Sequence, residues 1–272
     1  MRRLATMIGA TLLGGGLLLA TAPMAVAQDT GSVRVVHGIP GQPVDVYVDG
    51  ERALDDFEPA TVAGPVDLPA GAREVAVFPA DAPDASGTPL LEGSADVAAG
   101  ASATLVAHLD EQGQPALTPF VDDLSTVPAG QARLVVRHTA AAPAVDVLAG
   151  GAPLLTGLSN PGEASATAPA GTVSAAVAAS GTTDPVIGPA DLTLPEGSAT
   201  FVHAIGSLDE GSLDLVTFTV DGLHGSPSGV PSGAPSGAPY EATPGWAPAA
   251  IGVLGAGVLG AAVLLRRRGA RS

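Results

Sequence analysis

The sequence predicts an all-β fold made of two tandem antiparallel β-sandwich domains. The first observation is an internal repeat, because VRVVHGIPGQPVDVYVDG at residues 33–50 is answered by LVVRHTAAAPAVDVLAGG at residues 134–151. Second, apolar residues alternate with a period of two inside short runs, which is the pattern of half-buried strands. Third, glycine and proline separate these runs at the spacing typical of a sandwich.

The repeat continues beyond its opening and sets the domain boundaries. LPAG at residues 68–71 corresponds to APAG at 168–171, and SATLV at 102–106 corresponds to SATFV at 198–202. The expected parts of the chain are a signal peptide at 1–27, a first sandwich at 28–125, a second sandwich at 131–222, a stalk at 225–245, a transmembrane helix at 246–265 and a cytoplasmic tail at 266–272.

Residues 44–50 show the alternation most clearly. Their valines are expected on one side of a half-buried strand, with Asp45, Tyr47 and Asp49 on the other, and Asp49-Gly50 predicts a hairpin turn. The alanine-rich run 175–179 is too short to nucleate a helix. Further strand-like runs lie at 73–78, 103–108, 200–205 and 213–220. We expect about seven strands in each domain, in an immunoglobulin-like or transthyretin-like sandwich.

The N-terminus has the pattern of a secretory signal. Arg2 and Arg3 precede an apolar, charge-free run over residues 4–20, and Ala25-Val26-Ala27 forms a small-x-small cleavage site. The alternative is an uncleaved N-terminal anchor. Three consecutive glycines in the apolar run and the cleavage site both favour removal of the segment.

The C-terminus has the pattern of a single membrane anchor. Residues 226–239 form a Pro/Ser/Gly repeat that suits a stalk, and an uncharged, mostly apolar segment of membrane-spanning length follows it. Trp246 stands at the outer edge, and arginines 266–268 and 271 follow the helix, as the positive-inside rule requires. We therefore expect a single-pass protein of the cell membrane with an extracellular ectodomain. No L-P-x-T-G sorting motif precedes the helix.

The membrane helix also offers one interaction pattern. Gly252, Ala256 and Gly260 fall four residues apart, a spacing that lets two helices approach closely and dimerise. Because glycine and alanine dominate the whole segment, composition alone also accounts for this stripe.

Composition narrows the chemistry and the partners of the ectodomain. The chain has no cysteine, which excludes disulfides, thiolate nucleophiles and cysteine metal sites. Residues 28–225 carry 26 Asp and Glu against five Arg, a net charge of −21 with neutral histidines. Nucleic acid and anionic lipid are repelled by such a field, while cations, basic proteins and envelope glycans remain as partners. Solubility alone is the competing explanation of the acidity.

The repeated opening R-V-V-H…P-V-D-V-Y-V-D-G resembles the bacterial family of domains of unknown function DUF4397. The matching positions in the first copy are Arg34, Val35, Val36, His37, Pro40, Val44, Asp45, Val46, Tyr47, Val48, Asp49 and Gly50. The second copy departs from them at Ala141, Leu148 and Gly150. The resemblance covers nearly all of residues 32–222. It implies a surface-exposed β-sandwich, and it brings no established catalytic or ligand residues.

A histidine and an aspartate recur eight residues apart in both copies, as His37 with Asp45 and His138 with Asp146. A neutral imidazole beside a carboxylate suits ligand binding or proton transfer. Recurrence in both domains suits a hydrogen bond that locks the first two strands equally well. We favour this structural role for the family-motif positions, including Tyr47 and Asp49.

The remaining histidines and acidic pairs give weaker signals. Counted from Thr104 and Thr200, His108 and His203 are expected on opposite strand faces, which argues against a shared metal site. Three acidic pairs, at residues 55–56, 122–123 and 209–210, are expected in loops. Calcium could bind there, but without a dense D-x-D-x-D spacing we favour solvated surface.

No familiar catalytic motif occurs in the chain. G-x-S-x-G, H-E-x-x-H, a P-loop and an EF-hand loop are all missing from the sequence. We therefore expect a non-enzymatic cell-surface protein without a cofactor, acting in binding or in envelope structure. An extracellular hydrolase with an unrecognised site is the alternative.

Overall fold

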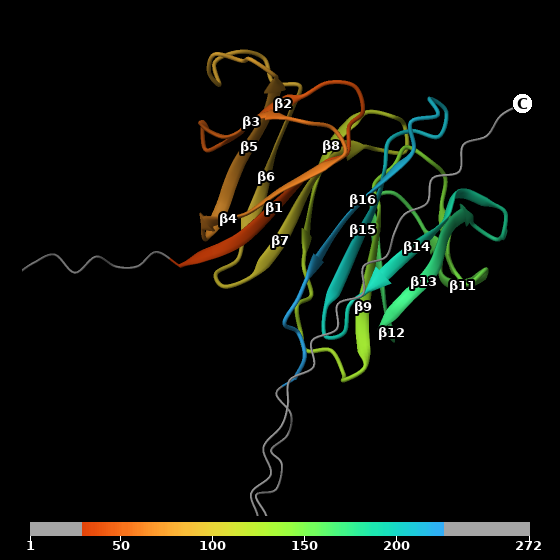
Figure 1. Ribbon diagram of the computed structural model, residues 1–272. Helices are drawn as coiled ribbons and strands as arrows, with labels where there is room; N and C mark the ends of the chain where they lie inside the picture. The colour runs from red at the N-terminus through yellow and green to blue at the C-terminus, as the bar shows by residue number, and fades with distance from the viewer. Residues whose placement is uncertain (1–28, 226–272) are drawn as a thin grey trace, which may run out of the picture. The chain divides into compact units, whose positions relative to one another are not determined.

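Sixteen β-strands form the part of the protein that the structure describes, residues 29–225 of a computed structural model (Figure 1). No helix within these residues is long and apolar enough to cross a membrane. The expected signal peptide, the stalk beyond residue 225, the transmembrane helix and the cytoplasmic tail lie outside the described residues. The alanine-rich run 175–179 belongs to a strand, as its short length indicated.

The strands divide equally between the two repeats, eight in each rather than the expected seven. Those of the first repeat are β1 (Thr30–His37), β2 (Val44–Val48), β3 (Glu51–Phe57), β4 (Thr61–Pro69), β5 (Gly71–Pro79), β6 (Leu91–Val97), β7 (Ser102–Leu109) and β8 (Pro115–Val121). Those of the second are β9 (Gln131–His138), β10 (Val145–Ala149), β11 (Ala152–Leu158), β12 (Gly162–Pro169), β13 (Gly171–Ala179), β14 (Pro185–Leu194), β15 (Ala199–Ile205) and β16 (Asp214–Val220).

Each repeat is a sandwich of two four-stranded sheets with the same strand order. The first repeat has the orders β4-β1-β7-β8 and β3-β2-β5-β6, and the second has β12-β9-β15-β16 and β11-β10-β13-β14. An immunoglobulin constant-type domain instead divides seven strands four to three. The division of eight strands into two four-stranded sheets therefore differs from that immunoglobulin arrangement.

The sandwiches are not purely antiparallel, which corrects the expectation. β1 pairs with β7 in parallel, and β9 pairs with β15 in parallel, while all the other strand pairs are antiparallel. Local alternation cannot reveal this, because a parallel pair joins segments that are distant in the chain.

The valines of β2 face the core as expected, with Val44 and Val46 packed against Val75 and Val77 of β5. The opposite face of β2 is also buried, however, and the strand is not half-exposed. Tyr47 is 4% exposed and its ring meets Phe78 edge-on at 5.2 Å. β2 is central in its sheet, and side chains of the neighbouring strand cover its second face.

The predicted hairpin turn at Asp49-Gly50 is present between β2 and β3. Asp49 has φ 51° and Gly50 has φ 82°, the left-handed conformations that a tight two-residue turn requires. In the second copy Gly150 and Gly151 take the same places with φ 58° and φ 82°. Glycine therefore replaces Asp49 without a change of turn.

The two sandwiches pack on each other through the outer faces of the sheets that hold the parallel pairs. Val36 of β1 and Val106 of β7 form one apolar cluster with Ile205 of β15 and Val216 of β16. The described residues of both repeats belong to a single compact unit. The outer face of each of these sheets is therefore an interior surface of the protein.

Candidate functional site

The motif histidines close the loops that follow β1 and β9. Nε2 of His37 donates a hydrogen bond to the carbonyl oxygen of Gln42 at 3.2 Å, and Nε2 of His138 donates to that of Pro143 at 3.0 Å. Both side chains are buried, and burial is the main cause that lowers the pKa of each imidazole. Each ring is thus held neutral at the end of its strand.

The motif aspartates bond to backbone and arginine partners, and neither forms a hydrogen bond with its motif histidine. Asp45 accepts from the amide of Asp56 at 3.0 Å and from Nη1 of Arg52 at 3.3 Å. Asp146 accepts from the amides of Gly157 and Gly181, at 2.8 Å and 2.9 Å. These amides lower the pKa of the Asp146 carboxyl.

Two further motif residues of the first copy stabilise the sheet β3-β2-β5-β6. The hydroxyl of Tyr47 donates to the carbonyl oxygen of Ala82 at 3.2 Å. Asp49 accepts from the amide of Glu74 at 3.0 Å and from Nη1 of Arg73 at 2.8 Å. The hydrogen bond from the Glu74 amide is the largest cause that lowers the pKa of Asp49.

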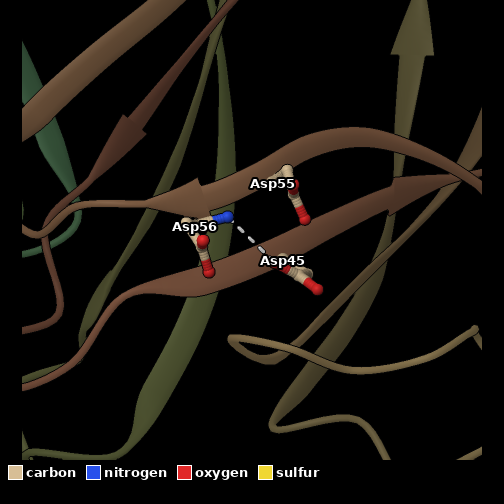
Figure 2. Close-up of side chains that lie close together, drawn as sticks. All are labelled: Asp45, Asp55 and Asp56. Atoms are coloured by element: carbon tan, nitrogen blue, oxygen red, sulfur yellow. Dashed lines mark hydrogen bonds between the residues drawn. The ribbon is translucent and has the colours of Figure 1, made fainter.

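Asp45, Asp55 and Asp56 bring three carboxylates together on β2 and β3 (Figure 2). The expectation that Asp55 and Asp56 lie in a loop is wrong, because both belong to β3. Arg52 already pairs with two of the three carboxylates, with Nη1 at 3.3 Å from Asp45 and 2.6 Å from Asp55. The cluster is explained as a strand-edge ion pair and carries no argument for a metal.

The strongest electrostatic feature is an ion pair buried between the two sandwiches. Arg137 of β9 is fully buried, and its Nη2 lies 2.8 Å from Oδ1 of Asp122, whose side chain is also fully buried. Nε of the same guanidinium lies 2.8 Å from Glu163. Its planar head stands 4.7 Å from the ring centroid of Phe120 and 4.9 Å from that of Phe201.

Asp122 is therefore not the solvated loop residue expected from the sequence. It also accepts hydrogen bonds from the hydroxyls of Ser102 and Thr104, at 2.9 Å and 2.8 Å. The carboxylate belongs to the segment after the first sandwich, whereas Arg137 belongs to the second. The pair thus ties the two repeats with a charge-assisted, fully desolvated contact.

His203 lies beside this pair on β15. Nη1 of Arg137 approaches its Nε2 at 3.3 Å, and its ring stacks on Phe218 with 5.7 Å between centroids. Because a guanidinium can only donate, Nε2 must be the accepting nitrogen. Burial, and then the charge of Arg137, lower the pKa of His203 to about 3.

His108 and His203 both point toward the inter-repeat contact, so the expectation of opposite faces is wrong. The error came from treating Thr104 and Thr200 as equivalent. Phe201 faces the contact while Val202 joins the core of the second sandwich, whereas in the first repeat Leu105 is the core residue. The matching segments are offset by one residue in three dimensions, and such an offset exchanges the faces.

His108 is also occupied by structural hydrogen bonds. Its Nε2 lies 2.8 Å from the hydroxyl of Thr118, and its Nδ1 donates to the carbonyl oxygen of Leu109 at 2.9 Å. Nδ2 of Asn160 donates to that same carbonyl at 2.8 Å and to the carbonyl oxygen of Ala140 at 2.6 Å. Asn160 of the second repeat thereby holds the end of β7 in the first.

Sequence reasoning missed Arg137, although a signal for it was present. The first copy has Val36 where the second has Arg137, and an arginine at a position that is apolar in the other copy is unusual inside a strand. Its partner Asp122 lies 15 residues away along the chain. No local pattern links the two residues.

Two four-plus-four β-sandwiches joined by a buried ion pair define the described part of the chain as a tandem β-sandwich protein. Residues 31–148 match the family model described as domain of unknown function (DUF4397), which supports that family for this region. The match includes the first sandwich, β9 and most of β10, and is shorter than the resemblance expected over residues 32–222. A comparison with curated proteins returned no match.

Proposed function

We propose that the chain is a non-enzymatic cell-surface protein whose two sandwiches act as one rigid module in binding or in envelope structure. The observation that carries this proposal is the buried Arg137–Asp122 pair between the repeats. Binding domains that move independently of each other do not require a desolvated ion pair between them. A module that must present its surfaces at a fixed spacing requires such a rigid contact between its domains.

The placement of the ionisable groups supports a role without catalysis. His37, His108, His138 and His203 are all at most 1% exposed, and the motif aspartates are used to hold strands. Catalytic acids and bases must instead reach a substrate within hydrogen-bond distance. The hydrolase alternative therefore has no support from these residues.

The location proposed is the outer face of a cell membrane, on a single C-terminal span. It rests on the sequence patterns of the two ends, a cleavable signal and an apolar helix followed by arginines. Dimerisation through Gly252, Ala256 and Gly260 is not part of this proposal, because the glycine and alanine content of the segment explains the stripe equally well.

A pull-down with the ectodomain, residues 28–225, against an envelope extract tests the function. We expect selective retention of one glycan or one basic protein, since the net charge of −21 repels polyanions. The matched control is Ile205→Asp, which disrupts the inter-repeat cluster and leaves both sandwich cores intact. Retention that is lost in this variant shows that the rigid pair is the binding unit.

A broad screen for hydrolysis by the same ectodomain separates the two function classes. Turnover of any envelope substrate that is absent from a heat-unfolded control would contradict the proposal. No retained partner together with no turnover would leave the envelope-structural role, which predicts altered envelope integrity when the gene is deleted.

A further inference from the structure

The second sandwich contains an apolar cavity that its sheets do not fill. The cavity has a volume of about 240 Å³ and opens between β14 and β16. Val136, Val177 and Val202 of its lining are buried on inner strands, while Ile187, Leu192 and Leu215 are half-buried on the edge strands β14 and β16 and flank its mouth. A second cavity of about 60 Å³ shares Val177 and Ile187 with the first, so the two hollows adjoin.

The same region of the first sandwich is closed, although the strand order is identical. The cavities between its sheets measure about 30 Å³ and about 10 Å³. Val75 of β5, which is 3% exposed, fills the place that Ala175 takes on β13. β6 also packs against β8, with Leu117 so close that a Cβ on Gly93 would lie 3.2 Å from it. The cavity is thus a property of the second repeat and not of the fold.

The lining defines the chemistry of a ligand. It is almost wholly hydrocarbon, and an apolar cavity of about 150 Å³ is already enough to stay dry and bind benzene. Thr217 of β16 pairs with the core residue Val202 and is exposed, which places its hydroxyl at the mouth. Asp191 is the one acidic residue of the lining, and together with the net negative charge of residues 28–225 it disfavours an anionic head group.

We propose that the second sandwich binds an uncharged molecule with an aliphatic body and one polar end. The body lies between the sheets against Val136, Val177 and Val202, and the polar end meets Thr217 at the mouth. The adjoining smaller hollow, which reaches the exposed side chains Val186 and Leu208, accommodates the far end of a longer body. The inference goes beyond the module function and does not depend on it.

To test the proposal, n-alkanols of increasing chain length are titrated into a protein of residues 28–225, and binding is measured by calorimetry. This fragment contains both cores and the whole inter-repeat contact, which form one compact unit. We expect affinity to rise roughly fourfold per methylene until the cavities are full, and then to level off. A C8 alkanoate should bind at least tenfold more weakly than octanol.

Cavity-filling variants locate the site. Ala175→Val introduces the residue that the first repeat already uses at this place, and should weaken octanol binding about tenfold. Ala175 and Ala190 pair across β13 and β14 and both line the cavity, so the double variant Ala175→Val, Ala190→Val should abolish binding. Thr193→Val, three residues along β14 and therefore on its other face, should leave binding unchanged. Thermal melts confirm that each variant is folded. If the double variant does not fold, the single variant Ala190→Val takes its place in the binding test.

Three results would overturn the proposal. The first is no saturable binding of any alkanol, and the second is equal binding by the wild type and the folded filling variants. The third is tighter binding of the alkanoate than of the alkanol. Failure of the envelope pull-down has no bearing on any of these three measurements.

Discussion

At the residue scale, four buried histidines should make the protein less stable in mild acid. Burial is the largest cause that lowers the pKa of His37, His108 and His138, and it lowers that of His203 to about 3. In the unfolded chain each titrates near its usual pKa of about 6.5. Between these limits the unfolded state binds more protons than the native state, so stability falls as the pH falls.

His203 provides the sharpest test of this dependence. His203→Gln keeps an acceptor for Arg137 but cannot be protonated, so the slope of unfolding free energy against pH should lose about one proton between pH 6 and pH 4. One proton corresponds to about 1.4 kcal/mol per pH unit. Urea unfolding at several pH values measures the slope, with His224→Gln at an exposed position as the control. An unchanged slope in His203→Gln would contradict the assignment.

Asp45 and Asp146 lie at equivalent positions but should respond differently to removal. Asp146 accepts from two amides and from the hydroxyl of Ser180, whereas Asp45 has one amide and the half-exposed Arg52. Asp146→Ala leaves more donors without an acceptor and should lower the melting temperature by several degrees, more than Asp45→Ala. The Asp→Asn variants at these two positions retain an acceptor, so their melting temperatures should lie between those of the wild type and of the Asp→Ala variants. Lost ligand binding at an unchanged melting temperature would indicate a functional carboxylate instead.

At the element scale, the contact of β9 and β15 with the first sandwich depends on Arg137. Arg137→Met leaves Asp122 buried without its cationic partner and should cost about 3–5 kcal/mol. Adding Asp122→Leu removes the stranded charge and should recover most of that loss. Urea unfolding measures both variants, and Arg73→Met, whose ion pair with Asp49 is partly exposed on both sides, should change little. A double variant as unstable as the single one would mean that packing, not charge, fails in Arg137→Met.

The strands could be predicted from the sequence because alternation and turn residues are local signals. The runs at 73–78 and 103–108 lie within β5 and β7, and Asp49-Gly50 forms its hairpin. The partners of β1 could not be predicted, since its parallel neighbour β7 lies far along the chain. Pairing between segments so far apart in the chain produces no periodic pattern in the sequence.

The candidate site was less predictable than the strands for a related reason. The letters SATLV and SATFV align without a gap, yet the structure offsets them by one residue, which reverses which side chains face the core. The histidine and aspartate of the motif likewise share a spacing without sharing a bond. Spacing identifies neighbouring strands, but hydrogen bonds depend on side-chain direction and on backbone groups that the letters do not show.

At the scale of the whole molecule, the surplus of acidic groups should make the fold dependent on salt. The 26 acidic groups repel one another more in the compact state than in an expanded chain. Thermal melts in sodium, magnesium and calcium chloride at matched ionic strength should superimpose. Stability should rise from a few millimolar to a few hundred millimolar salt and then level off. A calcium curve displaced upward by several degrees would instead show a specific ion site.

The proposed topology gives a test on intact cells. Protease added to protoplasts should release a soluble fragment cut between residues 226 and 243 and leave a small membrane stub. The reason is that a Pro/Ser/Gly-rich segment without a core is cut in preference to packed strands. Mass spectrometry of the released fragment locates the cut. An ectodomain that resists protease until the membrane is permeabilised would place it on the inner side.

The unlike faces that meet at Arg137 have a consequence for how the protein is made. One half of the joint carries a cation and the other carries its anion, so a half can pair with a complementary half but not with itself. Two such faces on separate molecules would join head to tail and extend into a filament. Residues 122–130, the short tether between β8 and β9, raise the local concentration of the correct partner far above that of any neighbouring chain. Because synthesis proceeds from the N-terminus, the first half is exposed until the second has folded, but during that interval the first halves of neighbouring chains cannot pair with one another.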